Sequence, residues 1–348
     1  MRRWLIIILA VAISLRASAF AETDQATVDL VLPTDNDALF HGGGSDFYQY
    51  IERDYNGAKS TPWEGGQYGF VRDPEQTNAG IVYTRFHEGI DIRPVKRDEN
   101  GEPLDEIRAI ADGKVVHTAL VPGYSNYGKY IVIEHHFGGS PYYSLYGHLS
   151  KIDVRPGDAV HRGQHIAVMG YTGVGINRER AHVHLELNLI MTHKFQEWYD
   201  AAHPKSDPNH QGLYNGINLC GLNIARLYLE LREKPSLTIP QLLRDEEVFY
   251  KVVLPNSRHF ELPKLYPWMV SGSGAKEPRS WTVSFARGSL PLRIEPSDRK
   301  VKFPEIVYVK PSKLDAHYLT NGIATGPASH ARLTRYGLQM MRMLIYPD

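Results

Sequence analysis

Four histidines and one aspartate are the residues of this chain whose types and spacing fit chemistry at a metal. They occur in three short segments, as His87 and Asp91, then His148, then His182 and His184. Imidazole nitrogens and a carboxylate oxygen form a normal ligand set for Zn²⁺, and a catalytic zinc site typically has three protein ligands with water in the fourth position. Zinc lowers the pKa of such a water to about 7 and polarises a carbonyl group. These residues therefore favour hydrolysis of an amide by a metal-activated water.

The spacing within two of the segments indicates how the side chains meet. Side chains alternate along a strand, so His182 and His184 share one face and stand about 7 Å apart at the base. Both rings can then approach one ion, or one binds it while the other reaches the water. His87 and Asp91 flank Gly89, which suits a turn that brings both to one point. The histidines that do not bind metal are expected to accept a proton and to stabilise the oxyanion.

The pair His87-Glu88 begins like the helical H-E-x-x-H zinc motif, in which the Glu is the general base. Here position 91 is Asp and Gly89 disfavours a helix. Glu88 is therefore not predicted to be the base.

The elements that must position these residues are short strands. Segments of about five residues, rich in Val, Ile and Tyr and bounded by turn residues, predict an antiparallel sheet. The predicted strands are Lys114 to Ala119, Tyr130 to Glu134, Tyr142 to Tyr146, Ile166 to Met169 and His182 to Leu189. The fold class is accordingly mainly β, with a compact antiparallel domain over 86–200.

The rest of the chain divides into an N-terminal extension, 22–85, and a smaller α+β region, 204–348. In the second region helices are predicted over Leu219 to Arg232 and Leu333 to Ile345. Strands are predicted there over Val248 to Leu254, Trp281 to Ala286 and Glu305 to Val309.

The first 21 residues have the order of a signal peptide. Arg2 and Arg3 precede an apolar run that is too short for a stable membrane span, and small residues follow it up to Ala21. Export to the periplasm or the extracellular space is therefore expected. The 348 residues hold 39 Lys plus Arg and 39 Asp plus Glu, so no net charge attracts nucleic acid. The only cysteine is Cys220, which excludes an intramolecular disulfide and a cysteine-based metal site.

From Phe86 to Leu189 the chain resembles the lysostaphin-type, or LytM-type, zinc metalloendopeptidases, many of which cut peptide bonds in bacterial cell walls. Besides the histidine segments, the resemblance rests on the stretches Ala109 to Val116, Asn126 to His135, Val154 to Val160, Gly163 to Ile166 and Gly170 to Gly173. It implies that His87, Asp91 and His184 are the zinc ligands, whereas His148 and His182 are the catalytic histidines. It also implies that loops of the domain wall a groove and that peptidoglycan peptides are the substrate.

Two alternatives to a cell-wall endopeptidase stay open at this point. One is a zinc peptidase that acts on a non-wall protein, and the other is a non-catalytic regulator of cell-wall amidases. Some relatives lack ligands and activate other hydrolases, whereas this chain keeps all five residues. The charged insertion Lys96 to Glu106 and the stretch Thr172 to Arg180 depart from the family pattern and are expected to border the groove. The sequence carries no prediction of oligomeric state.

Overall fold

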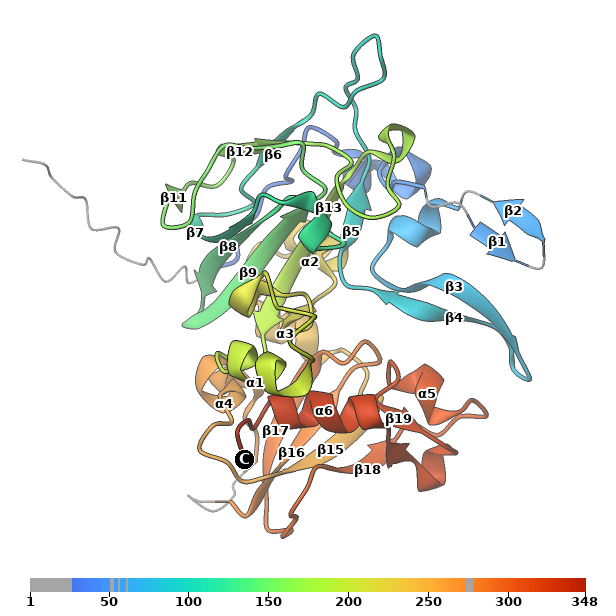
Figure 1. Cartoon of the computed structure of the whole chain (residues 1–348), viewed down its shortest axis with the longest axis vertical. Helices are drawn as coiled ribbons and strands as arrows, with labels where there is room; N and C mark the ends of the chain where they lie inside the picture. The colour runs from blue at the N-terminus through green and yellow to red at the C-terminus, as the bar shows by residue number, and fades with distance from the viewer. Residues whose placement is uncertain (1–26, 51–52, 56, 61, 273–277) are drawn as a thin grey trace, which may run out of the picture.

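The computed structural model describes residues 27–50, 53–55, 57–60, 62–272 and 278–348. The predicted signal peptide, 1–21, lies outside the described residues. The described chain has a sheet-rich part, a long β-hairpin at one side of it, and a second part that contains the C-terminus (Figure 1). In the described part of the chain, no helix is long and apolar enough to cross a membrane.

A seven-stranded antiparallel sheet forms the centre of the first part. Its strand order is β11-β7-β8-β9-β13-β14, and β5 pairs with β13 beside this path. The strands are β5 (Ile90–Ile92), β7 (Gly113–Ala119), β8 (Tyr130–Phe137), β9 (Ser140–Gly147), β11 (Ala159–Val160), β13 (Val183–Ile190) and β14 (Leu219–Gly221). A smaller sheet, β10-β12-β6, consists of β6 (Glu106–Arg108), β10 (Lys151–Ile152) and β12 (His165–Val168). The prediction of a mainly β, antiparallel fold is confirmed.

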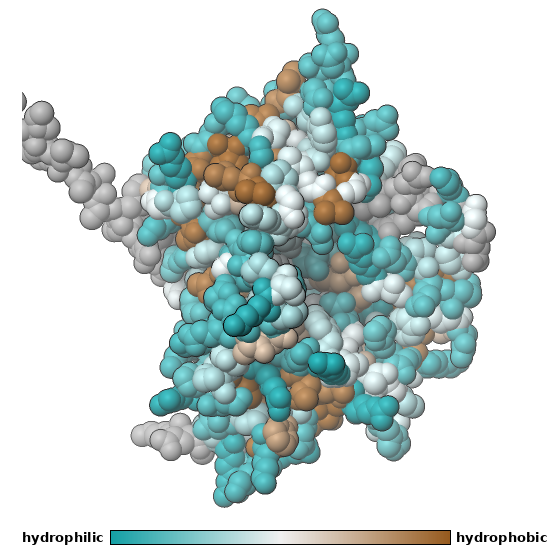
Figure 2. Space-filling model, viewed as in Figure 1, coloured by the Kyte–Doolittle hydropathy of each residue, from teal (hydrophilic) through white to brown (hydrophobic). Residues whose placement is uncertain are grey.

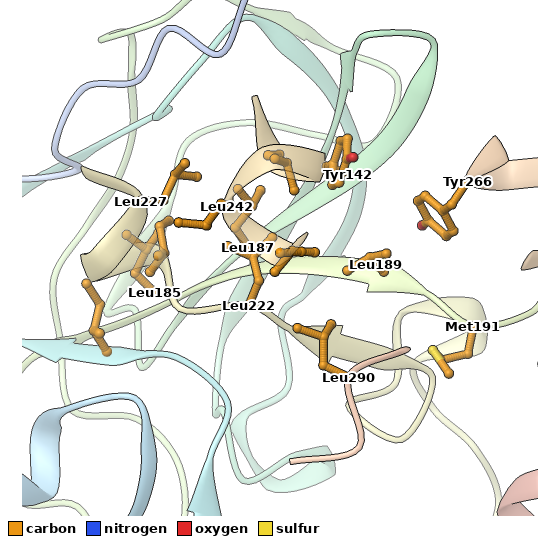
Figure 3. Close-up of a cluster of buried hydrophobic side chains, with 14 of the residues drawn as sticks. Tyr142, Leu185, Leu187, Leu189, Met191, Leu222, Leu227, Leu242, Tyr266 and Leu290 are labelled. Atoms are coloured by element: carbon orange, nitrogen blue, oxygen red, sulfur yellow. The ribbon is translucent and has the colours of Figure 1, made fainter. Parts of the chain in front are cut away.

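Strand β13 separates the core from the candidate site. Val183, Leu185, Leu187 and Leu189 join the hydrophobic core, whereas His184, Glu186 and Asn188 alternate with them. Figure 3 shows Leu185, Leu187 and Leu189 packed with Leu222, Leu227 and Leu242. All of these leucines are at most 1% exposed, so the core of the sheet continues into residues beyond 204.

The N-terminal extension ends in a long hairpin that leads directly into the candidate site. It consists of β3 (Gly69–Thr77) and β4 (Gly80–His87), and a short hairpin, β1 (Arg53–Tyr55) and β2 (Ala58–Ser60), precedes it. Trp63 stacks on Tyr48, and Tyr68 packs edge to face against Phe86. The first contact lies within the extension, whereas the second joins the extension to Phe86, the residue that follows it.

The C-terminal region is built around a four-stranded sheet of order β17-β16-β15-β18. Its strands are β15 (Tyr250–Pro255), β16 (Ser280–Phe285), β17 (Pro291–Ser297) and β18 (Glu305–Val309), with a further pair, β19 (Ala324–Thr325) and β20 (Arg332–Leu333). The helices of this region are α2 (Ile224–Glu233), α3 (Ile239–Arg244), α4 (Leu262–Leu265), α5 (Ala316–Leu319) and α6 (Arg335–Met343), and α1 (Phe195–Ala202) lies just before it. The mixed α+β character matches the prediction.

The helix predicted over Leu219 to Arg232 is wrong in its first part. Leu219, Cys220 and Gly221 form β14, because their backbone pairs with Ile190, Leu189 and Asn188 of β13. The helix α2 begins only at Ile224, where the side chain of Asn223 accepts a hydrogen bond from the backbone N–H of Arg226. Pairing with a distant strand therefore overrides the local helical pattern.

Candidate metal centre

The register of the central sheet brings His184 to Asp91. These residues are paired across β13 and β5, and on the other side of β13 His184 is paired with Gly147 of β9. A side chain at Gly147 would approach the Cβ of His184, so glycine leaves room for the imidazole. His148 follows at the end of β9, and His87 ends β4 just before the turn into β5. The fold thus gathers three segments that are far apart in sequence.

Three donor atoms converge in this place. Nε2 of His87 lies 3.0 Å from Nδ1 of His184, and Oδ1 of Asp91 lies 3.1 Å and 2.9 Å from these two nitrogens. All three residues are buried. Tetrahedral zinc with bonds of about 2.0–2.1 Å separates its donors by about 3.3 Å, so small movements would let the three atoms share one ion. The donor set and its geometry fit zinc.

Each candidate ligand also has a partner on its other side. Nδ1 of His87 donates to the carbonyl of Gln67 at 2.7 Å, which leaves Nε2 free to bind an ion. Nε2 of His184 pairs with Oε1 of Glu186 at 2.7 Å. Arg72 contacts Oδ2 of Asp91 at 2.6 Å. Gln67 and Arg72 carry no sequence signal that would have linked them to this site.

The protonation of the three residues reflects burial and mutual contact. Burial lowers the pKa of His87 to about 4, so its ring is neutral at pH 7. Burial acts against the charged form of Asp91, but His87, His182 and Arg72 together hold its pKa well below the ordinary value. Burial also opposes protonation of His184, yet its hydrogen bonds to Asp91 and Glu186 raise its pKa to about 9. A bound cation would displace that proton, since metal ligation needs a neutral imidazole.

The remaining two histidines lie beside the donor atoms. Nδ1 of His148 donates to the carbonyl of Thr172 at 2.8 Å, and Nδ1 of His182 donates to the carbonyl of Arg180 at 2.6 Å. In the neutral tautomer each ring therefore offers the lone pair of Nε2, and that of His182 lies 3.4 Å from Oδ1 of Asp91. His148 has a φ of 62°, a conformation that non-glycine residues rarely adopt and that is often found at functional sites.

A groove of about 1230 Å³ runs over these side chains. Hairpin β3–β4 lines one side with Arg72, Arg85 and Phe86, and residues 123–127 and 174–180 line another. Residues 206–217 of the C-terminal region add a further wall, where the ring of His210 stacks on Tyr124 with centroids 3.8 Å apart. On the face drawn in Figure 2 hydrophilic side chains predominate, and hydrophobic side chains form separate small areas.

Not every predicted groove residue lies there. The stretch that ends at Arg180 borders the groove as expected. The charged insertion, 96–106, is not among the groove-lining residues. It borders a separate hollow of about 430 Å³, together with Tyr48, Arg93 and Arg178.

Comparison with known proteins shows that part of the chain matches a peptidase family. The sequence profile of peptidase family M23 matches residues 85–196. An uncharacterized metalloprotease of Haemophilus influenzae is 33% identical over 105 residues, which are 30% of this chain and 19% of that protein. The peptidoglycan DD-endopeptidase ShyA of Vibrio cholerae is 45% identical over 76 residues, which are 22% of this chain and 16% of that protein. The chain thus spans less than a fifth of the length of either relative.

Among solved structures, the catalytic domain of the antimicrobial peptidase lysostaphin from Staphylococcus simulans is similar at 30% sequence identity. The match covers 36% of this chain and 82% of that one, with a TM-score of 0.24. The matched residues of the family profile include all five candidate site residues, from His87 to His184. Residues 85–196 therefore carry a peptidase family M23 domain, which confirms the resemblance inferred from the motifs.

Proposed function

We propose that this protein is a zinc-dependent metalloendopeptidase that hydrolyses peptide bonds in peptidoglycan. The observation that carries the proposal is the convergence of Nε2 of His87, Oδ1 of Asp91 and Nδ1 of His184 on one point of a groove. Two further histidines flank that point without belonging to the donor set. A non-catalytic regulator would not need this complete arrangement, so the arrangement supports an enzyme.

In this proposal His87, Asp91 and His184 hold the zinc ion, which supplies a polarising charge and an activated water when bound. Nδ1–H of His148 and of His182 donates to a backbone carbonyl, which in the neutral ring leaves Nε2 as the nitrogen that can accept a proton. Either ring can accept the proton of the attacking water and, once protonated, can donate a hydrogen bond to the oxygen that gains negative charge. Their fixed Nδ1–H contacts hold both rings in the orientation that these steps need.

The wall substrate and the place of action belong to the same proposal. The DD-endopeptidase relative acts on peptidoglycan by its name. The order of residues in 1–21 favours export and then a periplasmic or extracellular location. We infer a signal peptide over 1–21, an extension over 22–85, the peptidase domain over 86–200 and a C-terminal α+β region over 204–348.

The experiment that tests this function is mass spectrometry of the products released when the protein is incubated with purified peptidoglycan. The mature chain, loaded with zinc, is compared with His184→Ala and with a chelator-treated sample, and a folded protein substrate is run in parallel. New peptide fragments produced only by the unaltered, metal-loaded chain are expected. If the peptidoglycan stays intact while the protein substrate is cleaved, the enzyme acts on non-wall proteins. If neither substrate is cleaved, the proposal is overturned.

A further inference from the structure

The side chain of Arg72 holds the oxygen of Asp91 that faces away from the histidines. Its Nη2 donates to Oδ2 of Asp91 at 2.6 Å, and its Nε donates to the carbonyl of Gly65 at 2.9 Å. The side chain of Arg72 is 17% exposed and that of Asp91 is 2% exposed. A guanidinium held at two of its donors has little freedom to turn, so the carboxylate is held with it.

The two oxygens of Asp91 therefore have separate tasks. Oδ1 lies within 3.4 Å of ring nitrogens of His87, His182 and His184, whereas Oδ2 is occupied by Arg72. Only Oδ1 is directed at the position where the donor atoms converge. A carboxylate fixed in this way presents one oxygen to an ion rather than two.

A second candidate ligand is oriented by the same part of the chain. The carbonyl of Gln67 accepts the Nδ1–H of His87, which sets the tautomer that leaves Nε2 free. Gln67 and Arg72 both precede residue 85, where the match to the peptidase family begins. Two of the three candidate ligands thus depend on residues 62–77, outside the matched domain.

The C-terminal region in turn fixes the hairpin that carries Arg72. Phe70 and Phe86 pack with ring centroids 5.0 Å apart, and the guanidinium of Arg287 lies 4.0 Å above the ring of Phe70. The hydroxyl of Tyr68 donates to the carbonyl of Gly221 at 2.9 Å. These contacts come from opposite ends of the chain and hold β3–β4 against the central sheet.

We propose that Arg72 is a positioning residue of the metal centre, and that residues 62–77 are an integral part of that centre rather than a removable inhibitory segment. The inference rests on the proposed function, because it takes His87, Asp91 and His184 as ligands. Loss of Arg72 frees the carboxylate to rotate and leaves its second oxygen buried without a cation. Removing a contact of this kind from a metal ligand typically lowers metal affinity or activity by about 10- to 100-fold.

The test measures the zinc dissociation constant of the full mature chain by competition with a chromophoric chelator. Arg72→Met and Arg72→Lys are compared with Arg299→Met, which removes an exposed arginine from its ion pair with Glu305 in the C-terminal region. The visible spectrum of the cobalt-loaded proteins reports ligand geometry, and kcat and KM are measured on the product assay described above. Thermal unfolding without metal shows that each variant is folded.

We expect Arg72→Met to bind zinc about 10- to 100-fold more weakly, to change the cobalt spectrum and to lose kcat rather than KM. Arg72→Lys should regain little of the lost zinc affinity, because an ammonium group cannot reproduce the two fixed contacts of the guanidinium. Arg299→Met should match the unaltered chain. If Arg72→Met does not fold, Arg72→Lys decides the matter, since it keeps a cation beside Asp91.

Equal zinc affinity and an unchanged cobalt spectrum in folded Arg72 variants would overturn this inference and leave the proposed function intact. Zinc binding that depends on Arg72, in a chain that cleaves neither wall nor protein, would support the inference and overturn the proposed function. Failure of the unaltered chain to bind zinc would overturn both.

Discussion

The rings of His148 and His182 lie nearly edge to face, with centroids 4.6 Å apart, although they come from the ends of different strands. Nε2 of His87 contacts Nδ1 of His184 at 3.0 Å, whereas Nε2 of His182 lies farther out, 3.4 Å from Oδ1 of Asp91. His148 and His182 are each tied through Nδ1 to a backbone carbonyl of the 172–180 stretch. This arrangement separates side chains suited to proton transfer from side chains suited to ligation, and it leads to the first prediction.

Replacing His148 or His182 by Ala should abolish most activity without removing the metal. General acid–base groups contribute about 10²- to 10⁴-fold to rate, and we expect losses in that range for each variant. Zinc content per chain and kcat on peptidoglycan fragments give the measurement. His330→Ala, which alters an exposed histidine of the C-terminal region, is the control. Loss of bound zinc in His148→Ala would instead place this ring among the ligands.

His184→Ala should lose both zinc and stability. Glu186 is 1% exposed and its Oε1 pairs with Nε2 of His184, so the variant leaves a buried carboxylate without its main partner. Breaking a buried charged pair on one side costs on the order of 3 kcal/mol of unfolding free energy. The double variant His184→Ala/Glu186→Gln should recover part of the lost unfolding free energy, as measured by chemical denaturation. Neither the single nor the double variant should bind zinc. Equal stability of the single and double variants would show that the unpaired carboxylate of Glu186 does not destabilise His184→Ala.

Gly288→Ala should loosen the contact between the C-terminal region and the hairpin next to His87. A Cβ at Gly288 would overlap the ring of Phe86, and that ring is already packed between Tyr68 and Phe70. Overpacking of this kind costs about 1–3 kcal/mol, visible as a lower Tm in thermal unfolding. Gly123→Ala is the matched control, because a Cβ there meets no atom within 4 Å. An unchanged Tm in Gly288→Ala would mean that the C-terminal region and the hairpin can move apart without a loss of stability.

The stability of the protein should fall as the pH drops from about 6.5 to about 4, with His135 as one cause. Burial lowers the pKa of His135 to about 4, while an unfolded histidine titrates near 6.5. Between these values the unfolded chain binds a proton that the folded chain does not, so stability is complete above about 6.5 and is lost on acidification. The full effect of this residue is on the order of 3 kcal/mol, from about 1.36 kcal/mol per pKa unit.

The measurement for His135 is the free energy of unfolding at several pH values for the unaltered chain and for His135→Gln. His135 bonds the carbonyl of Asp112 and the hydroxyl of Ser144, so the variant should be less stable at every pH. Its loss of stability on acidification should nevertheless be smaller. Parallel curves for the two proteins would exclude His135 as a source of the pH dependence.

Much of the central sheet could be predicted because its signals are local. The alternation of Val183, Leu185 and Leu187 with His182 and His184 is readable in the sequence, and it places the histidines on the face away from the core. The strand now labelled β14 was missed, because Leu219 to Gly221 adopt an extended conformation only through pairing with β13. Strand formation through distant partners leaves no local periodicity.

The sequence by itself determined the five residues of the candidate site, since their types, their spacing and the glycines around them lie in short segments. It also determined the mainly β character of 86–200. Only the tertiary structure decided that His184 lies opposite Asp91, that Gln67 and Arg72 orient two of the candidate ligands, and that residues 206–217 wall the groove. The physical reason is that strand register and hairpin placement depend on contacts between segments tens to more than a hundred residues apart, which no short stretch of sequence encodes.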